Sequence, residues 1–303
     1  MPPGHLGRLA MALLVILIWS VCFVVIKASQ AETPPLFYGA LRALLAGFLL
    51  LAVAASTGRL LPPPRSWGWI AVLGLTNTTL GLAGMFLSVG TVGAAISAVL
   101  ANSQALLVAP FAALLFGETL TRGRVVGLLL GIGGVGLILF PAARGGSGGT
   151  EGAVLGLMMA GGLAAGNLVI KHMGRWVDAL TATAWQYVLG GLPLLGMSLM
   201  VENPSQVAWT PAFVTGLLFL AVVGSAGASW VWYLLVRDGE LIALNGLTLL
   251  TPALAVVLAL LIYREQISTS GMLGIAVVLV GVVCVNWPRH STSARDRAGL
   301  NPR

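Results

Sequence analysis

Charged residues are scarce in this chain of 303 residues. Asp, Glu, Lys and Arg together make up 8% of the sequence, whereas they form about a quarter of an ordinary soluble domain. Apolar residues make up 58%, against about 45–50% in soluble proteins. A chain of this composition cannot cover its surface with charge in water. The sequence therefore excludes an ordinary soluble globular domain.

Cysteine and histidine are also scarce. Cys22 and Cys284 lie inside apolar segments near opposite ends of the chain, and the three histidines fall in loops or at the ends of apolar segments. This distribution provides neither a disulfide framework nor a cluster of metal ligands. The segment "GGSGGT" lacks the lysine of a phosphate-binding loop. We therefore expect no metal, no cofactor and no enzyme activity.

Long apolar runs dominate the rest of the sequence. Charged residues divide the chain into ten such runs: 9–28, 34–55, 67–89, 94–116, 125–141, 152–170, 179–200, 211–236, 242–263 and 270–287. Each has about the 17–25 residues that a helix needs to cross a lipid bilayer. The first run has an apolar core of about 20 residues, longer than the 7–15 of a signal peptide. Because helices satisfy their own backbone groups in lipid, the sequence predicts an all-α polytopic membrane protein with ten transmembrane helices.

Basic residues gather on one side of this predicted topology. If the N-terminus is cytoplasmic, twelve Lys and Arg residues lie on the inner side, Lys27, Arg144 and Arg264 lie on the outer side, and Arg42 lies within a span. Cytoplasmic connections of membrane proteins carry such an excess of Lys and Arg. We therefore predict that both termini are cytoplasmic. The formal net charge of +7 is explained by this topology and requires no nucleic-acid partner.

An internal repeat emerges when the chain is shifted against itself. A shift of 147 residues pairs Glu118 with Glu265, Thr121 with Ser268, Gly127 with Gly274 and Gly134 with Gly281, and a shift of 144 pairs Lys27 with Lys171. The Gly-rich linker 142–151 separates a first five-helix repeat, 1–141, from a second, 152–288, which the basic cytoplasmic tail 289–303 follows. An odd number of helices per repeat inverts the second repeat in the membrane. Inverted repeats are typical of secondary transporters, whose substrate sites lie near the midplane.

The duplicated segments "GETLTRGRVVG" and "REQISTSGMLG" resemble the EamA family of the drug/metabolite transporter superfamily. Each has a Glu, a small hydroxyl residue three positions later and a Gly nine positions later. The first predicted helix, with Trp19 in its middle and Lys27 at its end, and the following helix with Arg42 resemble the same family. Within the family, the sequence is most similar to bacterial aromatic amino-acid exporters of the YddG type.

This resemblance implies a multi-pass transporter of the bacterial inner membrane that works as a monomer. It implies export of aromatic and other neutral amino acids by alternating access, through a central cavity between the repeats. Two alternatives stay open: a transporter of the same superfamily with another cargo, such as a drug-like compound or a nucleotide derivative, and a membrane protein without a transport function.

Arg42 is the charged residue that lies well inside a predicted span, where a charge costs about 2.5–3.5 kcal/mol on insertion scales. It could bind a substrate carboxylate, or it could satisfy backbone carbonyls without any role in binding. Its counterpart in the repeat is the neutral Gln186. No Asp or Glu lies in the middle of a span, so we expect facilitated export rather than proton coupling through a buried acid.

Neutral polar and aromatic residues in the spans complete the candidate substrate site. The candidates are Tyr38, Asn77, Asn102, Gln104 and Asn245 among the polar residues, and Trp19, Trp185 and Trp230 among the tryptophans. Amides in lipid must face protein or a wet cavity, and each could instead serve ordinary interhelical packing. Trp232 lies about 200° around the helix from Trp230. We do not expect both to face one cavity.

The predicted topology can be tested with cysteines placed at the two equivalent glutamates. Glu118→Cys should lie on the cytoplasmic side of the membrane and Glu265→Cys on the outer side, because the second repeat is inverted. A membrane-impermeant thiol reagent added to intact cells should label the second variant only. Labelling of both variants from the same side would contradict the inverted repeat.

Overall fold

The structure, a computed structural model, describes residues 5–143, 149–174, 176–263 and 269–286. Within these ranges every regular element is a helix. Six helical stretches are long and apolar enough to cross a membrane, and shorter apolar helices accompany them. The prediction of an all-helical, multi-pass membrane protein is confirmed at this level. The number of ten spans stays a prediction.

The described residues form seventeen helical elements. In chain order they are α1 (His5–Ser29), α2 (Pro35–Ser56), η1 (Pro64–Ser66), α3 (Trp67–Leu73), η2 (Gly74–Leu80), α4 (Gly81–Asn102), α5 (Gln104–Phe116), α6 (Arg122–Ala143), α7 (Gly149–Met173), α8 (Ala179–Val201), η3 (Pro204–Gln206), α9 (Pro211–Leu218), η4 (Phe219–Gly227), α10 (Ala228–Asp238), α11 (Leu241–Thr248), α12 (Leu250–Tyr263) and α13 (Thr269–Asn286). Of the short elements, η1 and η3 are 3-10 turns, whereas η2 and η4 are π-helical.

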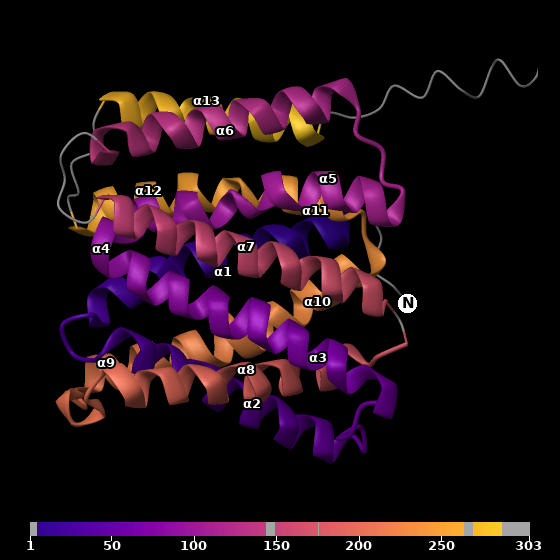
Figure 1. Cartoon of the computed structure of the whole chain (residues 1–303), viewed down its shortest axis with the longest axis vertical. Coiled ribbons are helices and arrows are strands. Elements are labelled where there is room, and N and C mark those ends of the chain that lie inside the picture. Colours follow the sequence, from indigo (N-terminus) through magenta and orange to yellow (C-terminus); the bar gives the residue numbers. More distant parts are fainter. Residues whose placement is uncertain (1–4, 144–148, 175, 264–268, 287–303) are drawn as a thin grey trace, which may run out of the picture.

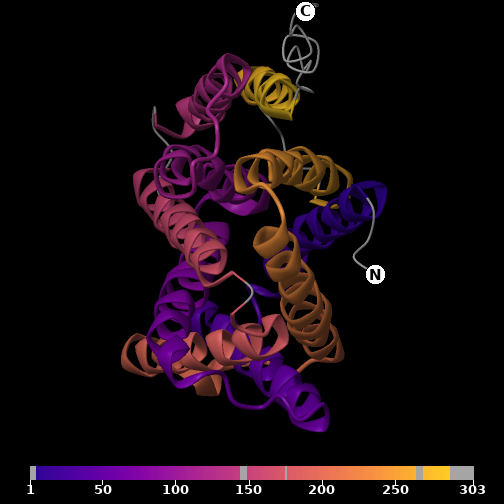
Figure 2. The same ribbon diagram turned by 90° about the vertical axis from the view of Figure 1, so that its right-hand side faces the viewer.

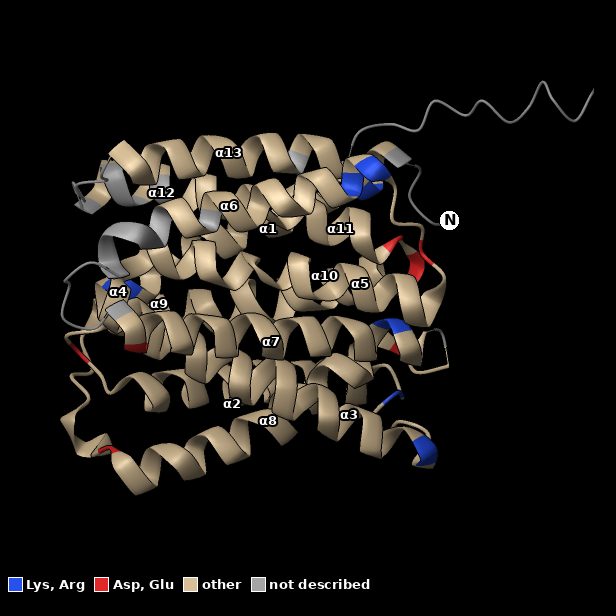
Figure 3. Ribbon diagram, turned by 45° about the horizontal axis from the view of Figure 1, so that its top comes forward, with Lys and Arg blue, Asp and Glu red and all other residues tan. Residues whose placement is uncertain are grey.

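The helices lie side by side in layers (Figure 1). α6 packs against α13 at one edge of the molecule, and α2 packs against α8 at the other edge. Between these pairs lie α5, α11 and α12, followed by α4, α7, α1 and α10. The same arrangement is visible after a 90° turn (Figure 2). Charged residues lie mostly at the two ends of the helices (Figure 3), as expected for a bundle whose middle lies in hydrocarbon.

Several apolar segments are interrupted rather than straight. Gly93 has a φ of 82°, which glycine adopts without strain, and it divides α4 between the predicted spans 67–89 and 94–116. Ser103 separates α4 from α5, and Leu249 separates α11 from α12. Broken helices in transporters are found where the backbone lines a cavity. These breaks therefore indicate a cavity in the interior of the bundle.

The two π-helical segments occupy corresponding places in the two halves of the sequence. Adding 147 to the bounds of η2 gives 221–227, which lies within η4. A π-helical turn changes the hydrogen-bond pattern of the backbone and is frequent at functional sites. Here the carbonyl of Gly224 in η4 accepts a hydrogen bond from Nε1 of Trp19 at 3.2 Å. This hydrogen bond connects the π-helical segment η4 to α1.

Small residues allow the helices to approach closely. A Cβ atom at Gly162 of α7 would lie 2.5 Å from the carbonyl oxygen of Thr76 and 3.1 Å from Cβ of Leu80, both in η2. A Cβ atom at the neighbouring Gly161 would have no other atom within 4 Å among the described residues. Glycine at position 162 therefore permits backbone contact between α7 and η2, as small residues do between membrane helices.

This packing predicts opposite effects for two adjacent substitutions in α7. Gly162→Ala should destabilise the protein by about 1–3 kcal/mol, because the new methyl group meets the backbone of η2. Gly161→Ala should be neutral or stabilising, since Ala is favoured over Gly in a helix by up to about 1 kcal/mol. Thermal unfolding of the purified variants in detergent measures both effects. Equal losses at both positions would contradict the packing of Gly162 against η2.

Candidate functional site

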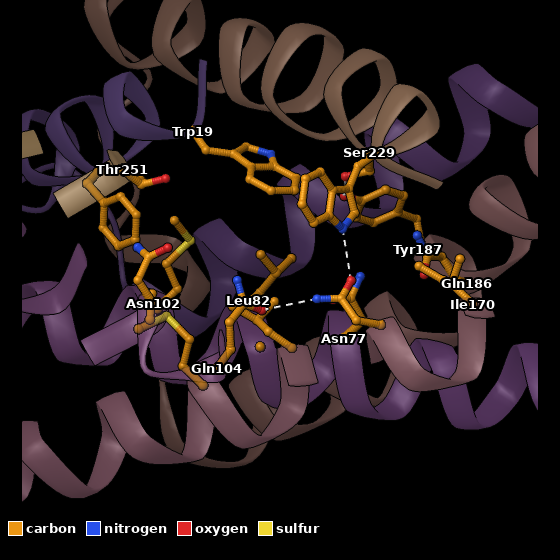
Figure 4. Close-up of a pocket in the computed structure, with 18 of the residues that line it drawn as sticks. Trp19, Asn77, Leu82, Asn102, Gln104, Ile170, Gln186, Tyr187, Ser229 and Thr251 are labelled. Atoms are coloured by element: carbon orange, nitrogen blue, oxygen red, sulfur yellow. Dashed lines mark hydrogen bonds between the residues drawn. The ribbon is translucent and has the colours of Figure 1, made fainter. Parts of the chain in front are cut away.

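A cavity of about 90 Å³ lies inside the bundle (Figure 4). Residues from α1, α2, η2, α4, α5, α7, α8, α10 and α12 line it, so both halves of the chain contribute. One water needs about 10–15 Å³, so the cavity has room for several waters. Its walls combine aromatic, aliphatic and neutral polar side chains with one charged side chain among the described residues, Arg42. This mixture is typical of sites that bind small molecules.

Arg42 brings a positive charge to the cavity wall and is 3% exposed. Its Nε donates to Oγ of Ser225 at 2.7 Å. Its terminal nitrogens lie 3.7 Å from Sδ of Met85 and 4.0 Å from Sγ of Cys22, which are weak acceptors. The ring centroid of Phe86 lies 6.0 Å from the guanidinium carbon. In the part of the chain that the structure describes, Arg42 forms no ion pair, so its guanidinium keeps donor capacity beside the cavity.

Asn167 organises a network of neutral polar side chains. Its Nδ2 donates to Oε1 of Gln104 at 3.3 Å and to Oδ1 of Asn245 at 3.0 Å. Its Oδ1 accepts a hydrogen bond from Nε1 of Trp232 at 2.8 Å. Asn245 in turn donates to the carbonyl of Leu241 at 3.0 Å. These bonds join α5, α7, α10 and α11, and they use both amide hydrogens of Asn167.

Two polar atoms on the cavity wall lack a protein partner. Oε1 of Gln186 and Oγ1 of Thr251 are buried and form no hydrogen bond with the described residues. A buried polar atom without a partner costs about 1–3 kcal/mol. Protein atoms cover both oxygens, so a rotation of either side chain is needed to present its oxygen to a water or a solute in the cavity. Gln186, Thr251 and Arg42 line the same cavity.

Six of the ten predicted site residues line this cavity: Trp19, Arg42, Asn77, Asn102, Gln104 and Gln186. Asn245 does not line the cavity, but its Oδ1 accepts a hydrogen bond from Asn167, which does. It therefore positions a cavity residue. The remaining three predicted residues lie elsewhere.

Trp230 and Trp232 occupy opposite faces of α10, as their spacing predicted, but the choice between them requires a correction. Trp230 is 38% exposed and is not among the residues that line the cavity. Trp232 lines the cavity and packs against Trp19 with a centroid separation of 5.1 Å. The π-helical segment that precedes α10 changes the helical register, so a regular helix gave no basis for choosing the inward face.

Tyr38 and Trp185 also lie away from the cavity lining. The ring of Tyr38 is buried and packs edge-on against Phe86, with the centroids 5.1 Å apart. Trp185 donates from Nε1 to the carbonyl of Leu60 at 2.9 Å, in the connection that follows α2. Both are therefore packing residues here, which is the alternative that the sequence left open for every candidate.

Asn167, Tyr187, Ser229, Trp232 and Thr251 line the cavity but are absent from the predicted site. The internal repeat could have found one of them, Thr251, whose counterpart at an offset of 147 is the predicted residue Gln104. In six pairs of equivalent positions both members line the cavity: Trp19 with Leu163, Phe23 with Asn167 and Arg42 with Gln186 at an offset of 144, and Leu82 with Ser229, Met85 with Trp232 and Gln104 with Thr251 at an offset of 147. Asn167, Ser229 and Trp232 pair with Phe23, Leu82 and Met85, which were not predicted, so the repeat alone did not indicate them.

Glu118 closes one end of the bundle beneath this network. Its Oε1 and Oε2 accept hydrogen bonds from the backbone amides of Leu241 and Ile242 at 2.7 and 2.8 Å. Lys171 lies 3.7 Å from Oε1 of Glu118 and also donates to the carbonyl of Gly239. A carboxylate is favourable at the positive N-terminal end of a helix. Glu118 thus holds the start of α11 to the end of α5.

Two further glutamates, Glu240 and Glu202, also hold the ends of helices. Arg124 and Glu240 form an ion pair of 2.6 Å beside Glu118. At the opposite end of the bundle, Glu202 accepts hydrogen bonds from the backbone amides of Leu36 and Phe37 in α2, at 2.9 and 2.8 Å. Each end therefore has a carboxylate that caps a helix of the other half. Glu265, the predicted counterpart of Glu118, lies outside the described residues.

Comparison with known proteins gives similarity over nearly the whole chain. The model of the EamA-like transporter family matches residues 7–140 and 150–287. An uncharacterized transporter of Synechocystis sp. is 32% identical over 290 residues, which cover 89% of this chain and 86% of that protein. A "Probable amino-acid metabolite efflux pump" of Escherichia coli K12 is 25% identical over 282 residues, which cover 90% of this chain and 92% of that protein.

A solved crystal structure has the same fold. Its TM-score is 0.72 at 18% sequence identity, and the alignment covers 93% of this chain and 96% of that chain. At this identity the likeness concerns the fold alone. It supports the arrangement of helices that forms the cavity.

The cap at Glu118 gives a prediction about stability. Glu118→Gln keeps the size of the side chain but loses its charge and one of its two acceptors, so it should destabilise the protein by about 1–3 kcal/mol. Thermal unfolding in detergent measures the loss. Glu151→Gln, at an exposed position in the first turn of α7, is the matched control and should change stability little. A Glu118→Gln variant as stable as this control would rule out the cap as a stabilising contact.

Proposed function

The chain belongs to the EamA-like transporter family, and on this premise we propose that it exports small metabolites, chiefly aromatic and other neutral amino acids, across a bacterial inner membrane. Membership of this family, which the duplicated glutamate segments predicted, is confirmed by the match over both halves of the chain. The family and its relatives are transporters, so the chain is a transporter and not an enzyme. The proposal concerns its cargo, direction and mechanism.

The main support for the proposal is that both halves of the chain line one cavity. Equivalent positions of the two halves line one space, and the π-segments η2 and η4 occur at corresponding places beside it. Two matches of one family model support a duplication. We propose that the chain spans the membrane ten times as two inverted five-helix repeats, 1–141 and 152–288, with both termini in the cytoplasm. The substrate site then lies where the halves meet, as in other transporters built from inverted repeats.

The cavity lining supports a small organic cargo of low charge. Trp19, Phe23 and Trp232 offer aromatic surface, and neutral amides such as Asn77 offer hydrogen bonds. No carboxylate is among the lining residues that the structure describes, so a cationic drug finds no counter-charge there. A single arginine is also too little charge for a polyphosphate. The relative in E. coli is named for amino-acid metabolites, and an amino acid satisfies the same constraints.

Alternating access requires that the contacts at the two ends open in turn. The cap of Glu118 on α11 closes one end, which the predicted topology places in the cytoplasm. The breaks at Ser103 and Leu249 and the two π-segments are positions where helices can bend. Because no titratable carboxylate of the described chain lines the cavity, we propose facilitated export rather than proton coupling through a buried acid. One chain encloses the cavity, so a monomer is the proposed working unit.

Transport can be measured with the purified protein in liposomes. Labelled phenylalanine and tryptophan should cross the membrane faster than in protein-free liposomes, and unlabelled aromatic amino acids and their derivatives should compete. Leu82→Trp, which fills the cavity from α4, should slow the flux at least about tenfold, since binding depends on free volume at the site. A control at Ile132→Trp, on the lipid-facing side of α6, should transport normally. Flux that is absent, or equal in both variants, would contradict the proposal.

A further inference from the structure

The charge of Arg42 is the feature of the cavity that a neutral cargo leaves unexplained. The guanidinium is buried, and its near partners in the described chain are a hydroxyl group, two sulfur atoms and an aromatic ring. None of these carries a negative charge. A charge in a low-dielectric site is stable only when it is paired. The wall of the cavity therefore lacks one negative charge.

The other unsatisfied groups of the cavity are neutral oxygen atoms. Oε1 of Gln186 and Oγ1 of Thr251 can accept a hydrogen bond, but neither can neutralise a cation. Gln186 is also the repeat counterpart of Arg42, so the two equivalent positions offer a cationic donor and a neutral acceptor. An ammonium group that enters with a carboxylate would bring a second positive charge, and the described lining holds no carboxylate to neutralise it.

We infer that this cavity selects a monoanion: an amino-acid-derived carboxylate whose amino group is absent, replaced by hydroxyl or acylated. The carboxylate binds the guanidinium of Arg42, the hydroxyl or amide N–H donates to a free oxygen such as Oε1 of Gln186, and the aromatic walls contact the apolar part. This inference rests on the proposed function and refines its cargo from neutral amino acids to their anionic derivatives. An inside-negative membrane potential by itself drives such an anion outward.

Three ligands of similar size and with the same benzyl group separate the charge states: 3-phenyllactate is a monoanion, phenylalanine a zwitterion and phenylalaninol a cation. Binding to the purified wild-type protein can be followed by quenching of tryptophan fluorescence and by thermal stabilisation. The monoanion should bind at least about tenfold more tightly than the zwitterion, the change expected for one uncompensated charge at a buried site. The cation should bind most weakly. Equal or tighter binding of phenylalanine would overturn the inference.

Two substitutions test whether Arg42 and Gln186 set this order. Arg42→Gln removes the positive charge and should abolish the preference for the monoanion. Gln186→Glu supplies the missing negative charge and should weaken phenyllactate binding while it raises the relative affinity for phenylalaninol. Thermal unfolding without ligand shows that each variant is folded. An unchanged order in a folded Arg42→Gln variant would overturn the inference.

The same ligand series distinguishes this inference from the proposed function. If the protein transports phenylalanine in liposomes better than phenyllactate, export of amino acids stands and the anion selectivity fails. If none of the three ligands binds or crosses the membrane, the proposed cargo itself fails. Transport of phenyllactate in preference to phenylalanine, lost in Arg42→Gln, supports both.

Discussion

Hydrocarbon offers no hydrogen bonds, and this constraint governs the arrangement of the whole molecule. Every polar side chain within a span must find a partner in the protein or in an internal cavity. Asn167 shows the first solution, because its amide is fully engaged by Gln104, Asn245 and Trp232. Arg42 shows the second, since its guanidinium faces a cavity and lacks a carboxylate partner in the described chain. Among the residues that line the cavity, Arg42, Gln186 and Thr251 carry the groups that the described protein leaves without a full set of partners, and these are the groups proposed to bind a solute.

The proposed pair of repeats, with different side chains at equivalent positions, would explain how one cavity combines such different surfaces. Equivalent positions hold Arg42 and Gln186, or Phe23 and Asn167, so one half supplies a charge or a ring where the other supplies an amide. Exchange of contacts between similar halves is the basis of alternating access in inverted-repeat transporters. Under the proposed mechanism, the different side chains would make the cavity selective without disturbing this exchange. The cap of Glu118 on α11 connects to this cavity through Asn245, which bonds to both Leu241 and Asn167.

Much of the fold could be predicted because apolar length and charge placement act locally along the chain. The positive φ of Gly93 divides α4 at the place where the sequence separates two spans. The direction of individual side chains was harder to predict. Trp230 and Trp232 differ by two positions, and the π-segment before them alters the helical register on which any choice depends. Asn167 is an isolated amide in an apolar segment, and its repeat counterpart, Phe23, was not itself a predicted site residue.

The space around Arg42 is the proposed water-accessible path of a transported solute. In a variant without Cys22 and Cys284, Leu82→Cys on the cavity wall and Ile132→Cys on the lipid-facing side of α6 can be exposed to a water-soluble thiol reagent in liposomes. The account predicts that the cysteine at position 82 reacts, that a transported solute slows this reaction, and that the cysteine at position 132 stays unmodified. A position 82 that never reacts, or that reacts at the same rate with and without the solute, would contradict it.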